Sequence, residues 1–176
     1  MEHRAFQLDP ELSTASQDKI SYLLGRLRAP KTALDEMIES CRAMFAAAGL
    51  PTLKRDGLTG NTFDSHRLLA YARTLPDPLE TQARCLHALF SQYFHHGCSM
   101  SDHDVLLAAA AEAGIDVAGA RMMLSTDAQA ATVCDQIAAA RAEGVTAVPH
   151  FRIGDRPVFG GGDSDFLAIF AEMARA

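Results

Sequence analysis

The sequence predicts an α/β fold in which a long helical stretch separates one short N-terminal strand from a C-terminal pair of strands. Residues 3–8 are expected to form the first strand, because Ala5, Phe6 and Leu8 are apolar and Pro10 cannot continue a ladder. Apolar residues at spacings of three and four then recur up to Gly144, which is typical of amphipathic helices. After Gly144 the pattern predicts strands at 145–153 and 157–159, and then a last helix that uses residues 166–173.

Two amphipathic helices are expected before residue 50. The second has the cleaner apolar stripe, and Gly49 can end it in a left-handed conformation. The stripes are Ile20, Leu23, Leu24 and Leu27 in the first helix, and Leu34, Ile38, Cys41, Phe45 and Ala48 in the second. Residues 50–60 are expected to form a loop or an irregular strand.

Five further helices are expected up to Gly144, and capping signals mark where each begins. A side-chain oxygen at such a position can accept one of the free amides of the first turn, while proline fits that turn without needing an amide. The signals are Asn61 or Thr62, Pro78, Ser101 with Asp104 as a capping box, Asp116, and Thr126 or Asp127.

Composition excludes several classes of protein. The formal net charge is -6 at pH 7, and no basic run offers the clustered cations that nucleic-acid binding needs. No apolar run approaches the ~18 residues of a membrane span, and the first residues do not resemble a secretory signal. We therefore expect a cytoplasmic protein that binds neither nucleic acid nor membrane.

The cysteines contain no C-x-x-C pair and are expected to be reduced thiols. Cys41, Cys85 and Cys134 lie on or beside apolar helix stripes, whereas Cys98 lies in an expected loop and is the most exposed candidate. The cluster of His95, His96, Cys98 and His103 has no standard ligand spacing, so we expect no metal site.

Residues 144–151, Gly-Val-Thr-Ala-Val-Pro-His-Phe, resemble the G-V-x-G-V-P-x-F signature of DsbA-like oxidoreductases of the thioredoxin superfamily. Ala147 replaces the usual glycine. The resemblance implies that Pro149 is the cis-proline of that family, and that Val148 presents its backbone edge to a thiol substrate.

Three further segments resemble the FrnE-type branch of the same family. Residues 4–10 resemble R-P-F-x-L-N/D-P, residues 60–68 resemble N-T-x-x-A/S-H-R-L, and residues 88–94 resemble L-F-x-A-Y-F. The match is collinear over nearly the whole chain. It implies a thioredoxin-like core made of residues 1–61 and 143–176, with an α-helical insertion at 62–142.

The same resemblance implies thiol–disulfide exchange on protein or small-molecule thiols. Family members place a strand and the start of a helix, with the redox cysteines between them, before the segment that resembles residues 4–10. This sequence has no counterpart of that nucleophile, so we expect the 176-residue chain to be redox-incompetent. The unpaired strand edges that this implies would favour a homodimer.

Four more residues have both a structural and a functional interpretation. Asn61 and His66 begin a helix, where capping explains Asn61, but the resemblance to kappa-class glutathione transferases and hydroxychromene carboxylate isomerases implies an active-site lining. Asp163 and Ser164 begin the last helix, where they would either cap it or hold the γ-glutamyl group of glutathione. No other cofactor is expected.

Two alternative functions remain open at this point. One is a glutathione-dependent isomerase or transferase of the kappa or hydroxychromene type. The other is a non-catalytic thioredoxin-fold binding module, which would bind peptides beside Val148 and Pro149 without turnover.

Overall fold

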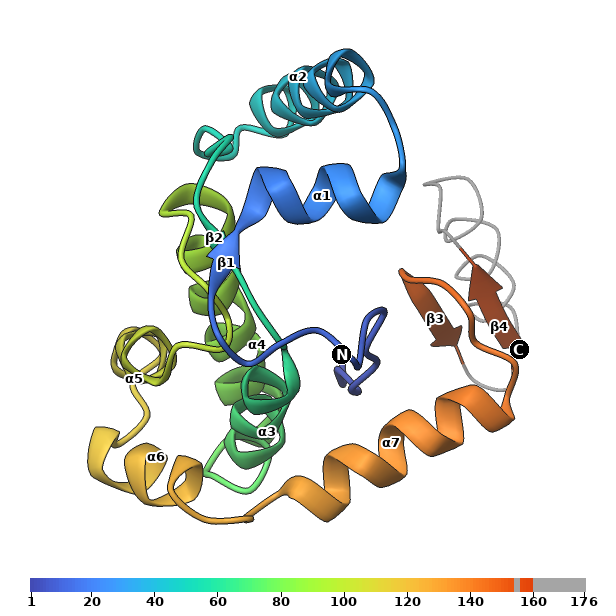
Figure 1. Ribbon diagram of the computed structural model, residues 1–176. Coiled ribbons are helices and arrows are strands. Elements are labelled where there is room, and N and C mark those ends of the chain that lie inside the picture. The colour runs from blue at the N-terminus through green and yellow to red at the C-terminus, as the bar shows by residue number, and fades with distance from the viewer. Residues whose placement is uncertain (154–155, 160–176) are drawn as a thin grey trace. The chain divides into compact units, whose positions relative to one another are not determined.

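The computed structural model describes residues 1–153 and 156–159, which form two compact units, Met1–Gln136 and Ile137–Ala176. The described residues form α-helices, a π-helical turn (η1) and two small antiparallel sheets (Figure 1). In chain order the elements are β1 (Gln17–Asp18), α1 (Lys19–Leu27), α2 (Lys31–Ala47), β2 (Leu58–Thr59), α3 (Phe63–Ala72), α4 (Pro78–Phe90), η1 (Ser91–His95), α5 (His103–Glu112), α6 (Val117–Leu124), α7 (Ala130–Ala142), β3 (His150–Ile153) and β4 (Arg156–Phe159).

The core of the first unit lies among α3, α4, α5 and α6 (Figure 1). Its apolar side chains recur at helical spacing in all four helices, which explains why these segments pack together rather than stay separate. Leu68, Cys85, Leu106 and Ala120 are among its members with 0% exposure. Burial of a leucine side chain contributes about 1.5–3 kcal/mol, so this cluster supplies much of the unit's stability.

Several predicted helix boundaries are confirmed, because local side-chain contacts set them. Asp116 caps α6, as expected, by accepting the Gly119 amide at 2.8 Å. Asp18 caps α1 by accepting the Ser21 amide at 2.7 Å, a cap that was not predicted. Pro78 occupies the first turn of α4. Gly49 follows α2 with a φ of 68°, the left-handed conformation expected of it.

Other boundaries were predicted wrongly. Asp102, not Ser101, caps α5 by accepting the Asp104 amide at 2.9 Å, because the Ser101 hydroxyl lies 2.9 Å from that of Ser99 instead. The last long helix begins at Ala130 rather than at 126 or 127, since Gln129 before it has a positive φ of 64°. The third strand covers only His150–Ile153 of the expected residues 145–153.

The expected strand at residues 3–8 is also absent from the described secondary structure. Side-chain amides take the place of a neighbouring strand. Gln82, which is 2% exposed, accepts the His3 amide at 2.9 Å and donates to the His3 carbonyl at 2.8 Å. The Gln136 side chain accepts the Ala5 amide at 2.8 Å. These contacts satisfy the backbone of the segment without a strand partner.

The helix that carries Phe90 ends in the π-helical turn η1, which the periodicity did not predict. Its carbonyl groups accept hydrogen bonds from the preceding part of the chain: Lys54 N donates to Phe94 O at 2.7 Å, and Lys19 Nζ donates to Tyr93 O at 3.1 Å. The Lys19 ammonium also lies 3.9 Å from the centroid of the Tyr93 ring. The turn thereby joins α1 and the loop after α2 to the helical core.

The second unit contains β3 and β4, which pair antiparallel with His150 opposite Phe159 and Phe151 opposite Val158. Among the described residues, β3 pairs with no other strand. Arg152 on β3 donates to Glu143, just beyond α7, at 2.7 Å. The expected turn at 154–155 and the last helix lie outside the described residues, and the boundaries 1–61, 62–142 and 143–176 remain a prediction.

No helix in the described ranges has the length and apolar character that crossing a bilayer requires.

Candidate functional site

The loop before β3 carries the two residues that the sequence singled out for substrate contact. The Val148–Pro149 peptide bond is cis, and both residues are exposed, Val148 by 48%. The loop is anchored where it leaves α7, because Val145 is buried and donates its amide to Ala140 O at 3.0 Å. Gly144 has a φ of 80°, which lets the chain turn there. An apolar side chain, that of Val148, is therefore held in solvent shortly before β3.

Asn61 uses its side chain on the protein itself. Its Oδ1 accepts the Phe63 amide at 2.8 Å and the Gln7 side-chain amide at 2.9 Å. Its Nδ2 donates to the carbonyl oxygens of Pro10 and Leu12 at 3.0 and 2.7 Å. Asn61 thus ties residues 7–12 to the start of α3, whereas Thr62 makes no side-chain cap. This is a wider structural role than the single cap that the sequence indicated.

His66 lies on α3 and is partly buried. Burial lowers the pKa of His66 below its ordinary value of 6.5, and a hydrogen bond with the Phe6 backbone opposes that shift only in part. The neutral imidazole therefore supports the N-terminal segment. The hydrogen bonds of the Asn61 side chain go to Gln7, Pro10, Leu12 and Phe63, and not to His66.

This histidine makes stability depend on pH. With a folded-state pKa below the unfolded value, the unfolded chain takes up a proton first as the pH falls below about 6.5. We expect the free energy of unfolding to decrease from pH 7.5 to 5.5, and to decrease less in His66→Gln. Urea denaturation at the two pH values measures the difference. His87→Gln, which removes an exposed imidazole from α4, should behave as the wild type. An equal decrease in wild type and His66→Gln would contradict the assignment.

Arg67 is the important residue of this segment to which sequence reasoning assigned no role. It is only 6% exposed, and its guanidinium donates to the carbonyl oxygens of Ala128 at 2.9 Å, Met123 at 2.7 Å and Thr126. Its Nη1 also lies 2.8 Å from Asp64 Oδ1. The signal in the sequence was an arginine directly before the buried pair Leu68 and Leu69 on the same helix.

Asp64 extends this network to the surface. Its Oδ2 lies 2.7 Å from His103 Nε2. Burial alone would raise the pKa of Asp64, but hydrogen bonds and charge from His103 and Arg67 hold the pKa below its usual value. The carboxylate is thus ionised at neutral pH and joins α3 to α5.

The segment of residues 4–10 contributes a second polar contact. Asp9 Oδ2 accepts a hydrogen bond from the Tyr22 hydroxyl at 3.0 Å, and Arg26 Nη2 donates to Leu8 O at 3.1 Å. Burial, followed by the hydrogen bond to Asp9, raises the pKa of Tyr22. Asp9, Tyr22 and Arg26 line a cavity of about 370 Å³ beside α1. The hydrogen bonds of Tyr22 and Arg26 hold residues 8 and 9 against α1.

The four cysteines are free thiols in different surroundings. Cys85 is buried, and burial raises the pKa of its thiol to about 12, which makes it a poor nucleophile. Cys41 and Cys98 are partly buried, whereas Cys134 is exposed, although the sequence had favoured Cys98 as the most exposed. Asp163 and Ser164 lie outside the described residues.

The histidine-rich segment around Cys98 does not gather its side chains. His95 Nδ1 lies 3.3 Å from Thr52 O, and His103 is paired with Asp64. Within the ranges that the structure describes, no three His, Cys, Asp or Glu side chains come together as metal ligands.

Comparison with known proteins identifies the fold. The model of the DSBA-like thioredoxin domain family matches residues 1–170. This chain belongs to that family. The DSBA-like chain also matches the crystal structure of a probable DsbA oxidoreductase from Streptomyces coelicolor with a TM-score of 0.85 and 26% identity, over 97% of this chain and 73% of that one.

A second solved structure has the same fold. It is a 2-hydroxychromene-2-carboxylate isomerase, with a TM-score of 0.66 and 17% identity over 98% of the DSBA-like chain and 78% of the isomerase. No curated protein sequence matches the chain significantly. The expected family and the thioredoxin-like α/β fold with helical additions are therefore confirmed.

Proposed function

We propose that this protein takes part in thiol–disulfide exchange and that its Val148–Pro149 loop contacts the thiol or disulfide substrate. The likeness over 97% of the chain to a probable DsbA oxidoreductase carries this proposal. The exposed Val148 beside the cis-proline supports it locally, since an apolar side chain in solvent can contact an extended peptide.

In this chemistry a thiolate attacks one sulfur of a disulfide, forms a mixed disulfide and releases the other sulfur as a thiolate. A second thiolate then attacks the mixed disulfide, which releases the substrate thiol and leaves the two protein sulfurs oxidised. The described geometry offers no cysteine pair for these steps, because the four thiols are separate and the sequence has no C-x-x-C. We therefore assign substrate binding, rather than the nucleophile, to this chain.

The proposal predicts that Val148→Asp weakens binding of an extended peptide with one cysteine by about tenfold. Loss of an apolar contact worth roughly 1.4 kcal/mol gives that factor. Fluorescence anisotropy with a labelled peptide measures the affinity. Leu79→Asp is a matched control, because Leu79 is also 48% exposed but lies in the first turn of α4. If Val148→Asp binds the peptide as tightly as the wild type does, the loop does not contact the substrate.

Two assays test the alternative functions. Insulin reduction tests for redox turnover, and thermal unfolding with glutathione tests for a glutathione-dependent enzyme. We expect insulin reduction at the uncatalysed rate, and turnover that requires one of the four cysteines would overturn that expectation. Glutathione that raises the melting temperature at millimolar concentration would instead favour a glutathione-dependent enzyme. The isomerase shares only the fold at 17% identity, so no observation favours that alternative over the first.

A further inference from the structure

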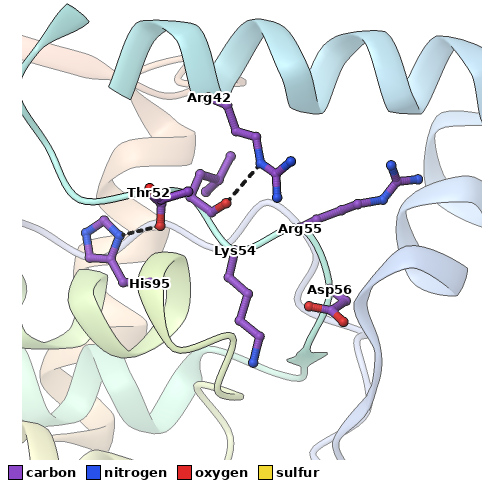
Figure 2. Close-up of a pocket in the computed structure, with 7 residues that line it drawn as sticks. Arg42, Thr52, Lys54, Arg55, Asp56 and His95 are labelled. Atoms are coloured by element: carbon purple, nitrogen blue, oxygen red, sulfur yellow. Dashed lines mark hydrogen bonds between the residues drawn. The ribbon is translucent and has the colours of Figure 1, made fainter. Parts of the chain in front are cut away.

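A cavity of about 560 Å³ lies between the C-terminal half of α2, the loop of residues 52–56 and η1 (Figure 2). Its volume falls in the range of about 300–1,000 Å³ that is usual for small-molecule sites. The polar residues that line it are Arg42, Thr52, Lys54, Arg55, Asp56 and His95.

The lining is basic, although the chain as a whole carries a formal charge of -6. Arg42, Lys54 and Arg55 contribute three permanent positive charges, and Asp56 is the one acidic residue of the lining. Glu39 and Asp35 pair with Arg42 and Arg55 and offset two of these charges. The attraction for an anion therefore comes from the N–H groups of Arg42, Lys54 and Arg55 that these pairs leave unused.

Its cations are held in place by contacts that leave donors unused. Arg42 Nε donates to Leu53 O at 3.1 Å, and Arg42 Nη1 to Glu39 Oε1 at 2.9 Å, so the guanidinium retains further N–H groups. Arg55 pairs with Asp35 through one Nη2. Lys54 Nζ donates to His96 O at 3.2 Å and keeps further protons. Anchoring of this kind reduces the entropy that a ligand must remove.

The π-helical turn completes the cavity. π-Helical turns are rare in proteins, and those that occur are frequently found at functional sites. Here the turn places His95 against the loop, with Nδ1 3.3 Å from Thr52 O, and its Phe94 carbonyl accepts the Lys54 amide. Figure 2 shows Arg42 reaching from α2 toward the loop and His95 approaching the loop from η1. Three elements thus meet at one charged hollow.

We propose that this cavity binds a small molecule that bears phosphate or carboxylate groups, with Arg42, Lys54 and Arg55 as the anion-binding residues. Arginine suits either group, because its planar fork can donate two parallel hydrogen bonds. Asp56, also in the lining, can accept a hydrogen bond from a hydroxyl or ammonium of the same molecule. Neither Val148 nor Pro149 lines this cavity, and the proposal does not depend on the proposed redox function.

Pyrophosphate and citrate serve as probes for the two kinds of anion, each titrated calorimetrically at constant ionic strength against sodium chloride. We expect one-to-one saturable binding of at least one probe to the wild type. Arg42→Gln should weaken that binding at least tenfold, and Lys54→Gln several-fold. Preference for pyrophosphate would assign a phosphate ligand, preference for citrate a carboxylate ligand, and equal binding would support the shared chemistry.

Arg73→Gln is the matched control, because the Arg73 side chain is 32% exposed, against 35% for Arg42. Arg73 lies at the C-terminal end of α3 and does not line the cavity. This variant should bind the probes as the wild type does. Circular dichroism establishes that each variant is folded, and Lys54→Gln tests the site if Arg42→Gln is not. Absence of saturable binding of both probes, or wild-type affinity in the folded lining variants, would overturn the proposal.

Discussion

Arg67→Ala is expected to lower the free energy of unfolding by about 3–5 kcal/mol, as is typical when one partner of a buried ionic network is removed. The change leaves the carbonyl oxygens of Met123, Thr126 and Ala128 without their donor, and it leaves Asp64 with only His103. Because these carbonyls lie at the end of α6 and in the loop that follows it, the packing of α6 on α3 should weaken as well. Urea denaturation followed by circular dichroism measures the loss.

Two variants make this prediction specific. Arg67→Lys keeps the positive charge but cannot donate in the same planar arrangement, so it should recover only part of the stability. Arg73→Ala removes a more exposed arginine at the end of the same helix, whose nearest carboxylate oxygen lies 3.8 Å away on Glu2. That change should cost less than about 1 kcal/mol. A loss of similar size in the Arg67 and Arg73 variants would contradict the buried network.

Gly57→Ala is expected to lower the free energy of unfolding by about 3 kcal/mol or more, through overpacking and backbone strain. A Cβ at this position would lie 2.3 Å from the carbonyl oxygen of Gly97 and 2.7 Å from its Cα, and both atoms belong to a backbone that cannot move aside cheaply. Gly57 also has a φ of 136°, a conformation that side chains disfavour. Thermal and urea unfolding both report the effect.

The reason for this sensitivity is a crossing of two backbone segments. Gly57 O accepts the Lys19 amide at 2.9 Å, and Gly97 O accepts the Leu58 amide at 2.8 Å, so the same contact joins α1, β2 and the segment after η1. Gly25→Ala is the control, because a Cβ there meets nothing within 4 Å and alanine favours the interior of α1 by up to about 1 kcal/mol. Equal stability of the two variants would show that the segments can separate without cost.

The two proposals about binding concern different parts of the chain and can fail independently. The loop at Val148 is argued from the family to which the chain belongs, whereas the cavity beside Arg42 is argued from charge and anchoring alone. Peptide binding by the Arg42→Gln variant should therefore equal that of the wild type. Conversely, Val148→Asp should bind pyrophosphate or citrate as the wild type does.

Much of the fold could be predicted from the sequence because the contacts that define it are local. The cap at Asp116 bonds to an amide three residues away, and Gly49 needs only its own φ. Such signals do not depend on what the rest of the chain does. The segment at 144–151 similarly carried enough specific residues to indicate the DSBA-like family.

Contacts between distant residues could be settled only by the tertiary structure. The segment at 3–8 has apolar residues typical of a strand, but its amides bond to Gln82 and Gln136, which lie 79 and 131 residues away from their partners. Arg67 finds its carbonyl partners 56 to 61 residues later. The basic cavity likewise depends on a loop and a π-helical turn about 40 residues apart. Sequence periodicity records which face of an element is apolar, whereas the partner of a buried polar group is decided only when the elements pack.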